Sequence, residues 1–524
     1  MMFRMWQLIS DNIIFALLLL VSLTMLGGCA THKLQTDTAK KLEYALPPTS
    51  SGALHDFAGR AARSAASDES VFLPLSSNMD ALHWRILLID KAQQSIDIQY
   101  YLIDRDEGSK LLGVHLLNAA DRGVRVRILV DDVFLTGRDQ AIADWNSHPN
   151  ISIHVFNPWH KRGSLVQQGL EFLGYFERLN QRMHNKLTVV DGQVGITGGR
   201  NIGNAYFGLS NKYNFRDLEV IVTGPVVSEL EDSFDLYWND DWTMSAEAFA
   251  DASTAPDLFA KILHKRQQAI TDSEMMHTAG LSDYAADPKY LIHFIDNAAK
   301  GPAWVAYDDP PSAFLEDSGV RKVDQLEDMD ADISRELIIV SPYFIPSEVF
   351  LGKLRDLTAR GVRVVVLTNS LASTNHTMVN SGYSPWRKKL LEAGVELFEY
   401  RSDAANTSEI LMPGVESKFI SLHTKTFVID RENVYIGSLN MDPRSFHLNT
   451  EMGLLINAPA LAEQIAEQVE KDMNPDNAWR VSLEEDERLA WHSSAGTVYL
   501  QPARHFGQRI LDFFYGLLPI KDQL

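Results

Sequence analysis

The stretch HNKLTVVD at residues 184–191 is matched, 239 residues later, by HTKTFVID at residues 423–430. Both have the form H-x-K-x-x-x-x-D. In each copy a glycine follows the histidine by 14 positions and an asparagine follows it by 17 positions. A single pattern of this kind arises by chance, whereas two copies in one register indicate an internal duplication.

The segments around the two copies repeat in the same register. SIDIQYYLI at 95–103 favours a strand, 108–122 has apolar residues at helical spacing, and 124–132 again favours a strand. The same series recurs over 336–367. This β-α-β order predicts an α/β protein with two tandem domains, each a mixed β-sheet flanked by helices, packed with pseudo-two-fold symmetry.

The histidine and lysine of each motif are two residues apart. Side chains at i and i+2 of a strand point to the same face, so His184 and Lys186 share a face, as do His423 and Lys425. If the two domains pack with these faces together, two imidazoles and two ammonium groups meet in one cleft. The residues of both motifs are then catalytic candidates.

The motif aspartates have a different expected role. Asp191 and Asp430 follow their histidines by seven positions, an odd spacing that turns them away from the shared face. We expect each to tie the end of its strand to a neighbouring backbone segment.

A cleft of this composition suits a phosphodiester. The lysines would stabilise charge on the phosphate oxygens, with Asn201, Asn440 and Ser438 as further phosphate-binding candidates. One histidine would attack phosphorus, and the other would protonate the leaving alkoxide. Asp217 and Glu451 are the candidates for orienting the histidines. Because lysine supplies positive charge, we expect neither a metal nor a cofactor.

Composition restricts the alternatives. The chain has 524 residues and a formal net charge of −21, which disfavours general binding of nucleic acid. Its 16 histidines accompany a single cysteine, which excludes a disulfide framework and a cysteine zinc cluster.

That cysteine follows a charge-free apolar run. Residues 13–26 are too few to span a bilayer comfortably and favour an export signal. The run ends in Leu-Gly-Gly-Cys at 26–29, which resembles a bacterial lipobox with Cys29 as the lipid attachment site. An uncleaved anchor is the alternative. Ala30 after the cysteine implies, by the same resemblance, an envelope protein facing the periplasm at the outer membrane.

The paired motifs resemble the signature of the phospholipase D superfamily. Longer stretches are similar to the class C bacterial cardiolipin synthases: RMHNKLTVVDG, GGRNIGNAYFG, residues 367–400, GSLNMDPRS, NTEMG and LLPIKDQL. The resemblance implies two phospholipase D-like domains and transfer of a phosphatidyl group onto phosphatidylglycerol, giving cardiolipin. It also implies that His184 is the nucleophile and His423 the acid and base. The implied partners are phospholipid substrates and a membrane surface, and the sequence indicates no protein partner.

Other functions remain open at this point. They are hydrolysis to phosphatidic acid, phosphodiester cleavage in nucleic acid, and a lipid-binding scaffold without turnover. The apolar segment 506–520 either inserts at a lipid interface or packs as a terminal helix. The expected boundaries are a lipoprotein-type signal at 1–28, a tether at 29–75, a first domain at 76–264, a linker at 265–300, a second domain at 301–480 and an extension at 481–524.

Overall fold

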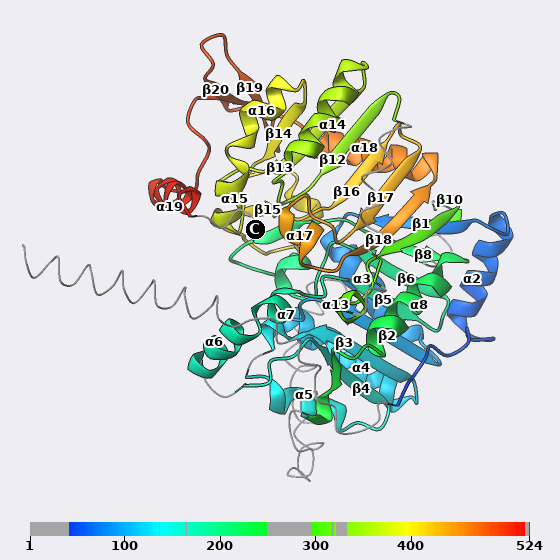
Figure 1. The fold of residues 1–524 in the computed structure, drawn as a ribbon. Coiled ribbons are helices and arrows are strands. Elements are labelled where there is room, and N and C mark those ends of the chain that lie inside the picture. The colour runs from blue at the N-terminus through cyan, green and yellow to red at the C-terminus, as the bar shows by residue number, and fades with distance from the viewer. Residues whose placement is uncertain are drawn as a thin grey trace, which may run out of the picture.

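The computed structural model contains two large β-sheets packed against each other with helices around them (Figure 1). It describes residues 41–135, 137–162, 165–248, 291, 295–296, 298–315, 319–320, 333–518 and 523. The expected signal segment and Cys29 therefore lie outside the described residues, as does most of the expected linker.

The first sheet has nine strands in the order β10-β1-β8-β6-β5-β2-β3-β4-β9. Their bounds are β1 Ser70–Leu75, β2 Ser95–Tyr100, β3 Arg125–Asp131, β4 Ile151–Phe156, β5 Leu187–Val190, β6 Val194–Gly198, β8 Glu219–Thr223, β9 Thr243–Ser245 and β10 Ala299–Gly301.

The second sheet has ten strands in the order β11-β18-β17-β16-β12-β13-β14-β19-β20-β21. Their bounds are β11 Ala303–Tyr307, β12 Glu336–Val340, β13 Arg363–Asn369, β14 Glu396–Tyr400, β16 Thr426–Ile429, β17 Asn433–Gly437, β18 Met452–Asn457, β19 Ala478–Leu483, β20 Leu489–Ser493 and β21 Gly496–Val498. A small third sheet pairs β7 (Asn214–Arg216) with β15 (Ile420–Leu422).

The two large sheets repeat one topology, which confirms the predicted duplication. Six central strands run β8-β6-β5-β2-β3-β4 in the first sheet and β18-β17-β16-β12-β13-β14 in the second. In both, the last three strands are mutually parallel and the first three are antiparallel. The predicted mixed sheets are therefore present in both halves.

Helices cover the sheets on their outer faces and fill the space between them. Their bounds are α2 Ala53–Ser64, α3 Asn78–Lys91, α4 Glu107–Asp121, α5 Asp139–Asn146, α6 Leu165–Gly174, α7 Phe176–Asn180, α8 Val226–Trp238, α13 Pro311–Leu315, α14 Glu348–Ala359, α15 Thr377–Tyr383, α16 Trp386–Glu392, α17 Pro443–His447, α18 Pro459–Asp472 and α19 Phe506–Gly516. Short 3-10 turns lie at Asp132–Phe134, Asn204–Tyr206, Ala246–Ala248 and Thr407–Glu409.

The core between the sheets belongs to both halves. Helix α8 of the first half contacts β11 of the second, and α18 of the second half contacts β1 and β10 of the first. Side chains alternate along the strands: Ile338 and Val340 enter this shared core, whereas Leu337 and Ile339 enter a separate core under α14. The two domains thus bury one continuous apolar layer between them.

The predicted tether at 29–75 is wrong for its described part. Helix α2 buries Leu54 and Phe57, and β1 lies inside the first sheet between β10 and β8. The apolar run VFLPL at 71–75 explains the difference from the expected tether. Burial of these side chains in the sheet stabilises the protein more than their exposure to water would. The expected C-terminal extension also begins inside a sheet, since β19 to β21 continue the second one.

Candidate active site

The third sheet positions one motif histidine. Strand β15 ends immediately before His423, and its parallel partner β7 ends immediately before Asp217. The backbone N–H of His423 donates to the carbonyl of Arg216 at 2.7 Å. A carboxylate of the first half is thereby brought beside the histidine of the second half.

The other histidine is placed by the symmetry-related contact. Met183 pairs in parallel with Thr450. The N–H of His184 donates to the carbonyl of Thr450 at 2.9 Å, and the N–H of Thr450 donates to the carbonyl of Arg182 at 2.9 Å. Glu451 of the second half therefore lies beside His184 of the first.

The two histidine–carboxylate pairs are crossed between the halves. His184 Nδ1 lies 2.8 Å from Oε2 of Glu451, and His423 Nδ1 lies 2.6 Å from Oδ2 of Asp217. All four side chains are buried. A carboxylate accepts hydrogen bonds, so Nδ1 of each ring carries the hydrogen and Nε2 is left for chemistry. Asp217 and Glu451 hold the orienting positions that the sequence predicts, each for the histidine of the other half.

The motif lysines are buried next to the histidines. Lys186 Nζ donates to the carbonyl of His184 at 2.5 Å, and Lys425 Nζ donates to that of His423 at 2.6 Å. Lys186 also lies 5.6 Å from the centre of the Tyr101 ring. The strands begin only at Leu187 and Thr426, after each histidine and lysine, so the predicted common strand face is wrong and these hydrogen bonds hold each lysine beside its histidine.

Burial and mutual repulsion lower the pKa of the cationic groups. Burial lowers the pKa of Lys186 to about 7 and that of Lys425 to about 8. Burial and the nearby lysines lower the pKa of His423 to about 3 and hold that of His184 well below its usual value of 6.5. Each histidine is influenced by the lysines of both halves, so the two motifs form one electrostatic unit.

The two carboxylates differ in charge. Burial raises the pKa of Glu451 to about 7. Burial acts on Asp217 in the same direction, but the facing His423 and Lys425 outweigh it and hold the pKa of Asp217 below 3.8. Near neutral pH Asp217 is therefore an anion, whereas Glu451 is only partly ionised.

A glycine–serine difference accompanies this asymmetry. Ser438, expected to bind phosphate, instead donates its hydroxyl to Glu451 and receives the N–H of Met452 at 3.0 Å. The equivalent position in the first half is Gly199, where a Cβ would lie 2.2 Å from Oδ1 of Asp217. Ser438 thus supports the carboxylate rather than facing substrate, and the first half has no room for such a residue.

Both predicted asparagines lie in the site. Asn201 Nδ2 donates to the hydroxyl of Tyr206 at 2.9 Å, and Asn440 Nδ2 lies 3.4 Å from Oγ of Ser445. Within the described part of the chain, the side-chain oxygens of both asparagines are buried without a hydrogen-bond partner. An amide oxygen only accepts hydrogen bonds, so a phosphate-binding role for either asparagine depends on the second hydrogen of its NH2 group.

Aromatic rings that the sequence analysis did not single out pack on the histidines. Tyr101 meets the His184 ring edge-on at 5.0 Å between centres, and Tyr206 meets the His423 ring edge-on at 5.3 Å. Phe215 lies 4.7 Å from the His423 ring. The sequence offered one indication of this packing. Tyr100 and Tyr101 stand together at the end of a predicted strand, where an aromatic side chain can contact a motif histidine.

The motif aspartates lie outside the cluster and bind backbone. Asp191 accepts the N–H groups of Gln93, Gln94 and Ser95 at 2.7 to 3.1 Å. Asp430 accepts those of Ser334, Arg335 and Glu336 at 2.7 to 2.9 Å. Both have positive φ, 56° and 52°. They join the motif strand to the start of the neighbouring strand, as expected for a structural role.

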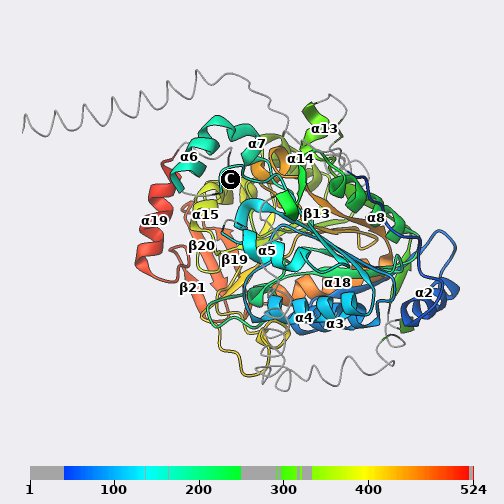
Figure 2. The ribbon, with the colours of Figure 1, turned by 90° about the horizontal axis from the view of Figure 1, so that it is seen from below.

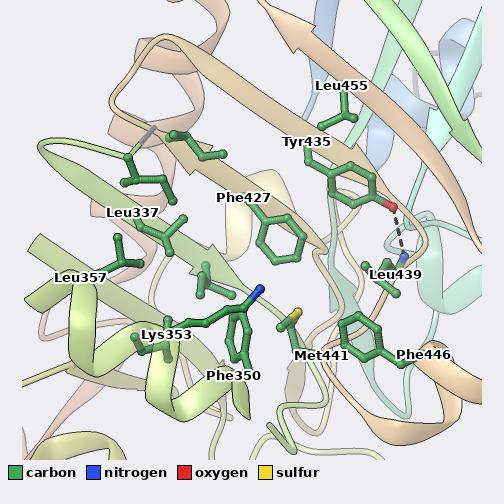
Figure 3. Close-up of a pocket in the computed structure, with 14 residues that line it drawn as sticks. Leu337, Phe350, Lys353, Leu357, Phe427, Tyr435, Leu439, Met441, Phe446 and Leu455 are labelled. Atoms are coloured by element: carbon green, nitrogen blue, oxygen red, sulfur yellow. Dashed lines mark hydrogen bonds between the residues drawn. The ribbon is translucent and has the colours of Figure 1, made fainter. Parts of the chain in front are cut away.

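An apolar pocket lies between the second sheet and α14 (Figure 3). Leu439 and Met441, the neighbours of Asn440, line it together with side chains of α14, and the N–H of Leu439 donates to the Tyr435 hydroxyl at 3.4 Å. Asn440 thus lies in the chain between two residues that line this pocket.

Comparison with known proteins identifies the family of the chain. Residues 86–238 and 331–473 match the family described as "Cardiolipin synthase, PLD-like domain". The chain is 35% identical to cardiolipin synthase C of Escherichia coli over 86% of its own length and 95% of that protein. It is 29% identical to cardiolipin synthase A of Pseudomonas putida over 73% of its length and 64% of that protein.

A solved structure shares the fold. Phosphatidylserine synthase of Haemophilus influenzae superposes with a TM-score of 0.55 at 15% identity, covering 89% of this chain and all of that one. Both halves of the chain, each with one motif of the crossed site, fall within the family match. The chain belongs to the family of cardiolipin synthases with phospholipase D-like domains, and it is an enzyme of that type.

Proposed function

We propose that this enzyme transfers a phosphatidyl group from one phospholipid to the glycerol headgroup of phosphatidylglycerol and so makes cardiolipin. Phosphatidylethanolamine or phosphatidylglycerol is the proposed donor. The observation that carries the proposal is the pair of histidines, each oriented by a carboxylate of the opposite half, with a buried lysine beside each.

In the first step His184 Nε2 attacks phosphorus, forming a P–N bond as the P–O bond to the donor headgroup breaks. His423 gives its proton to the departing alkoxide. In the second step His423 takes a proton from a hydroxyl of the acceptor, whose oxygen attacks phosphorus as the P–N bond breaks. Lys186, Lys425 and the asparagine amides stabilise the phosphate oxygens throughout.

The carboxylate asymmetry supports His184 as the nucleophile. An ionised Asp217 beside His423 stabilises an imidazolium, the form that a general acid needs. Glu451 has a pKa of about 7 and gives less stabilisation to a charged His184 ring. A bound phosphodiester adds negative charge near both rings, which offsets the lysines and favours protonation of His423.

The test is analysis of lipid products. The purified enzyme, given phosphatidylethanolamine and phosphatidylglycerol alone and in mixture, should form cardiolipin, and rapid denaturation at alkaline pH, where the P–N bond survives, should trap a phosphatidyl group on His184. Replacement H184A should abolish both signals, whereas H423A should still allow slow phosphorylation by a donor with a good leaving group. Phosphatidic acid as the main product would establish hydrolysis instead, and cleavage of DNA without lipid turnover would establish a nuclease.

We also propose that Cys29 carries lipid and holds the enzyme at the outer membrane, facing the periplasm. The run 13–26 followed by Leu-Gly-Gly-Cys supports this. In the described part of the chain, no helix has the length and apolar character needed to cross a bilayer. Mass spectrometry of the mature N-terminus should find a lipidated Cys29, and C29S should leave the signal uncleaved.

A further inference from the structure

Helix α19 turns its polar side chains inward and its apolar ones outward. Gln508 is buried and donates to the carbonyl of Leu371 at 2.6 Å. Asp512 is buried and accepts from Asn380 and Gln501, both at 2.8 Å. The opposite face exposes a stripe at i, i+4, i+7 and i+11, formed by Phe506, Ile510, Phe513 and Leu517. This orientation is the reverse of a helix whose apolar stripe faces the core.

Helix α6, in the other half of the chain, has the same inversion. Its acidic residue, Glu171, is buried and accepts the N–H groups of His160 and Lys161 at 2.9 and 2.7 Å. Its exposed side chains include Val166, Leu170 and Leu173, which are 74, 62 and 48% exposed. Two helices that hide their carboxylates and expose aliphatic groups are unlike scattered surface leucines, which need no explanation.

The two helices project from the same side of the molecule in both views (Figures 1 and 2). Helix α6 leads into α7, which ends at Asn180, four residues before His184. Beyond α19 the chain returns to this place, because Gln523 accepts from Asn180 at 2.7 Å and from Arg444 at 3.1 Å. The positive charge of Arg444 also contributes to lowering the pKa of His184.

The charge of α6 and α19 themselves differs from that of the whole molecule, although α7 after α6 exposes Glu177. The chain has 69 acidic residues and a net charge of −21. Over the described side chains of α6 and α19, no exposed carboxylate occurs, and the chain just before these helices exposes Lys161 and Arg504. A surface with apolar groups at its centre and cations at its edge matches the boundary between lipid headgroups and acyl chains.

We propose that the exposed faces of α6 and α19 form one membrane-docking surface, which inserts into the lipid interface and holds the active-site entrance against its lipid substrates. The inference rests on the proposed lipid function and adds the surface through which substrate arrives. Because the net charge repels anionic lipid, the docking free energy comes from apolar burial. Salt should therefore leave binding unchanged or strengthen it.

The first test uses the full chain and a local probe, so that the N-terminal segment does not affect the result. In a C29S background the chain has no other cysteine, so F513C and L170C accept a single environment-sensitive fluorophore. The control is V349C on α14, because Val349 is 69% exposed, close to the 65 and 62% of Phe513 and Leu170. Vesicles of phosphatidylethanolamine and phosphatidylglycerol should shift the emission at 513 and 170 to the blue, but not at 349.

The second test is kinetic. The double replacement F513S/F514S should lower turnover of vesicle substrate by about tenfold or more. The variant lacks two aromatic side chains whose transfer from water into the lipid interface stabilises docking. Turnover of a short-chain phospholipid dissolved as monomers should stay unchanged, as should both activities of V349S. Loss of both activities together would instead indicate damage to the fold and would contradict the proposal.

Three results separate the possibilities. Absence of a shift at 513 and 170 while the protein sediments with vesicles would overturn the docking surface. A blue shift without vesicles that grows with protein concentration would also overturn it, by assigning the surface to a second copy of the chain. A shift at both positions in an enzyme without lipid turnover would leave docking intact and refute the proposed function.

Discussion

At the residue scale, the feature that matters most is the exchange of carboxylates between the two motifs. Asp217 serves His423 and Glu451 serves His184, so each ring depends on a side chain from the opposite half. Sequence comparison of the halves finds all four residues, because the histidines share the repeated motif and Asp217 and Glu451 each lie eight positions before a proline. It does not find the exchange, which follows from pairing of β7 with β15 and of Met183 with Thr450.

Replacement of Glu451 by glutamine should impair catalysis more than binding. The amide has the same shape, but it presents a donor to Nδ1 half of the time and no longer fixes the ring tautomer. We expect kcat to fall by on the order of 10²-fold or more with little change in KM. Steady-state kinetics on monomeric substrate should be compared with E467Q, an exposed glutamate on α18. Equal activity of the two variants would contradict the orienting role.

The buried lysines predict an alkaline limit to activity. The pKa of Lys186 is lowered to about 7 and that of Lys425 to about 8, so both lose charge as pH rises through this range. The fraction of enzyme with both ammonium groups falls accordingly, and kcat/KM should decline above about pH 7 and more steeply above about pH 8.

A lysine-to-arginine replacement tests the origin of that limit. Arginine keeps its charge, so K186R should move the onset of the alkaline decline from about pH 7 to about pH 8, where Lys425 titrates, even where geometry lowers the maximum rate. The measurement is the pH profile of kcat/KM, with the surface variant K471R as control. An unshifted profile would place the titration on another group.

At the element scale, the predicted strands and helices agree well with the structure where the pattern is strong. The helix expected over 108–122 is α4 at Glu107–Asp121, and the helix of the series that recurs over 336–367 is α14 at Glu348–Ala359. The strand β1 was missed because polar and small residues dominate residues 29–69, and six strand residues at their end were assigned with them. The short segment Ser70–Leu75 forms a strand because it pairs with β8 and β10, and this long-range pairing is not visible in the local sequence.

The strand ends make a separate prediction for the motif aspartates. Asp191 and Asp430 accept three backbone N–H groups each in a left-handed conformation, so their contribution should be to stability. Valine at either position loses the acceptor and disfavours positive φ, which should cost about 3–5 kcal/mol of unfolding free energy. Asparagine keeps one acceptor and tolerates this conformation, so it should cost about 1 kcal/mol.

Denaturant unfolding of D191N, D191V, D430N and D430V would measure these costs. Activity per folded molecule should stay near that of the parent enzyme in the asparagine variants. A large loss of kcat in D191N with unchanged stability would place this aspartate in the chemistry instead.

At the scale of the whole molecule, the two halves are joined by more than the site. The central core contains Val222 and Leu230 of the first half with Val428 and Leu461 of the second. The chain also passes from β10 in one sheet directly to β11 in the other. A site made of exchanged side chains needs this arrangement, because a small rotation between halves would separate both histidine–carboxylate pairs at once.

The shared core predicts that the described halves unfold together. Leu230 on α8 and Leu461 on α18 are both fully buried in it, so L230A and L461A should each cost about 2–5 kcal/mol. Because the lost contacts belong to one layer, both variants should lower the temperature of the same calorimetric transition, whereas L236A, at a position 39% exposed on α8, should change it little. Two transitions, one moved only by L230A and the other only by L461A, would show that the halves are independent. The crossed site would then have to assemble between domains that fold separately.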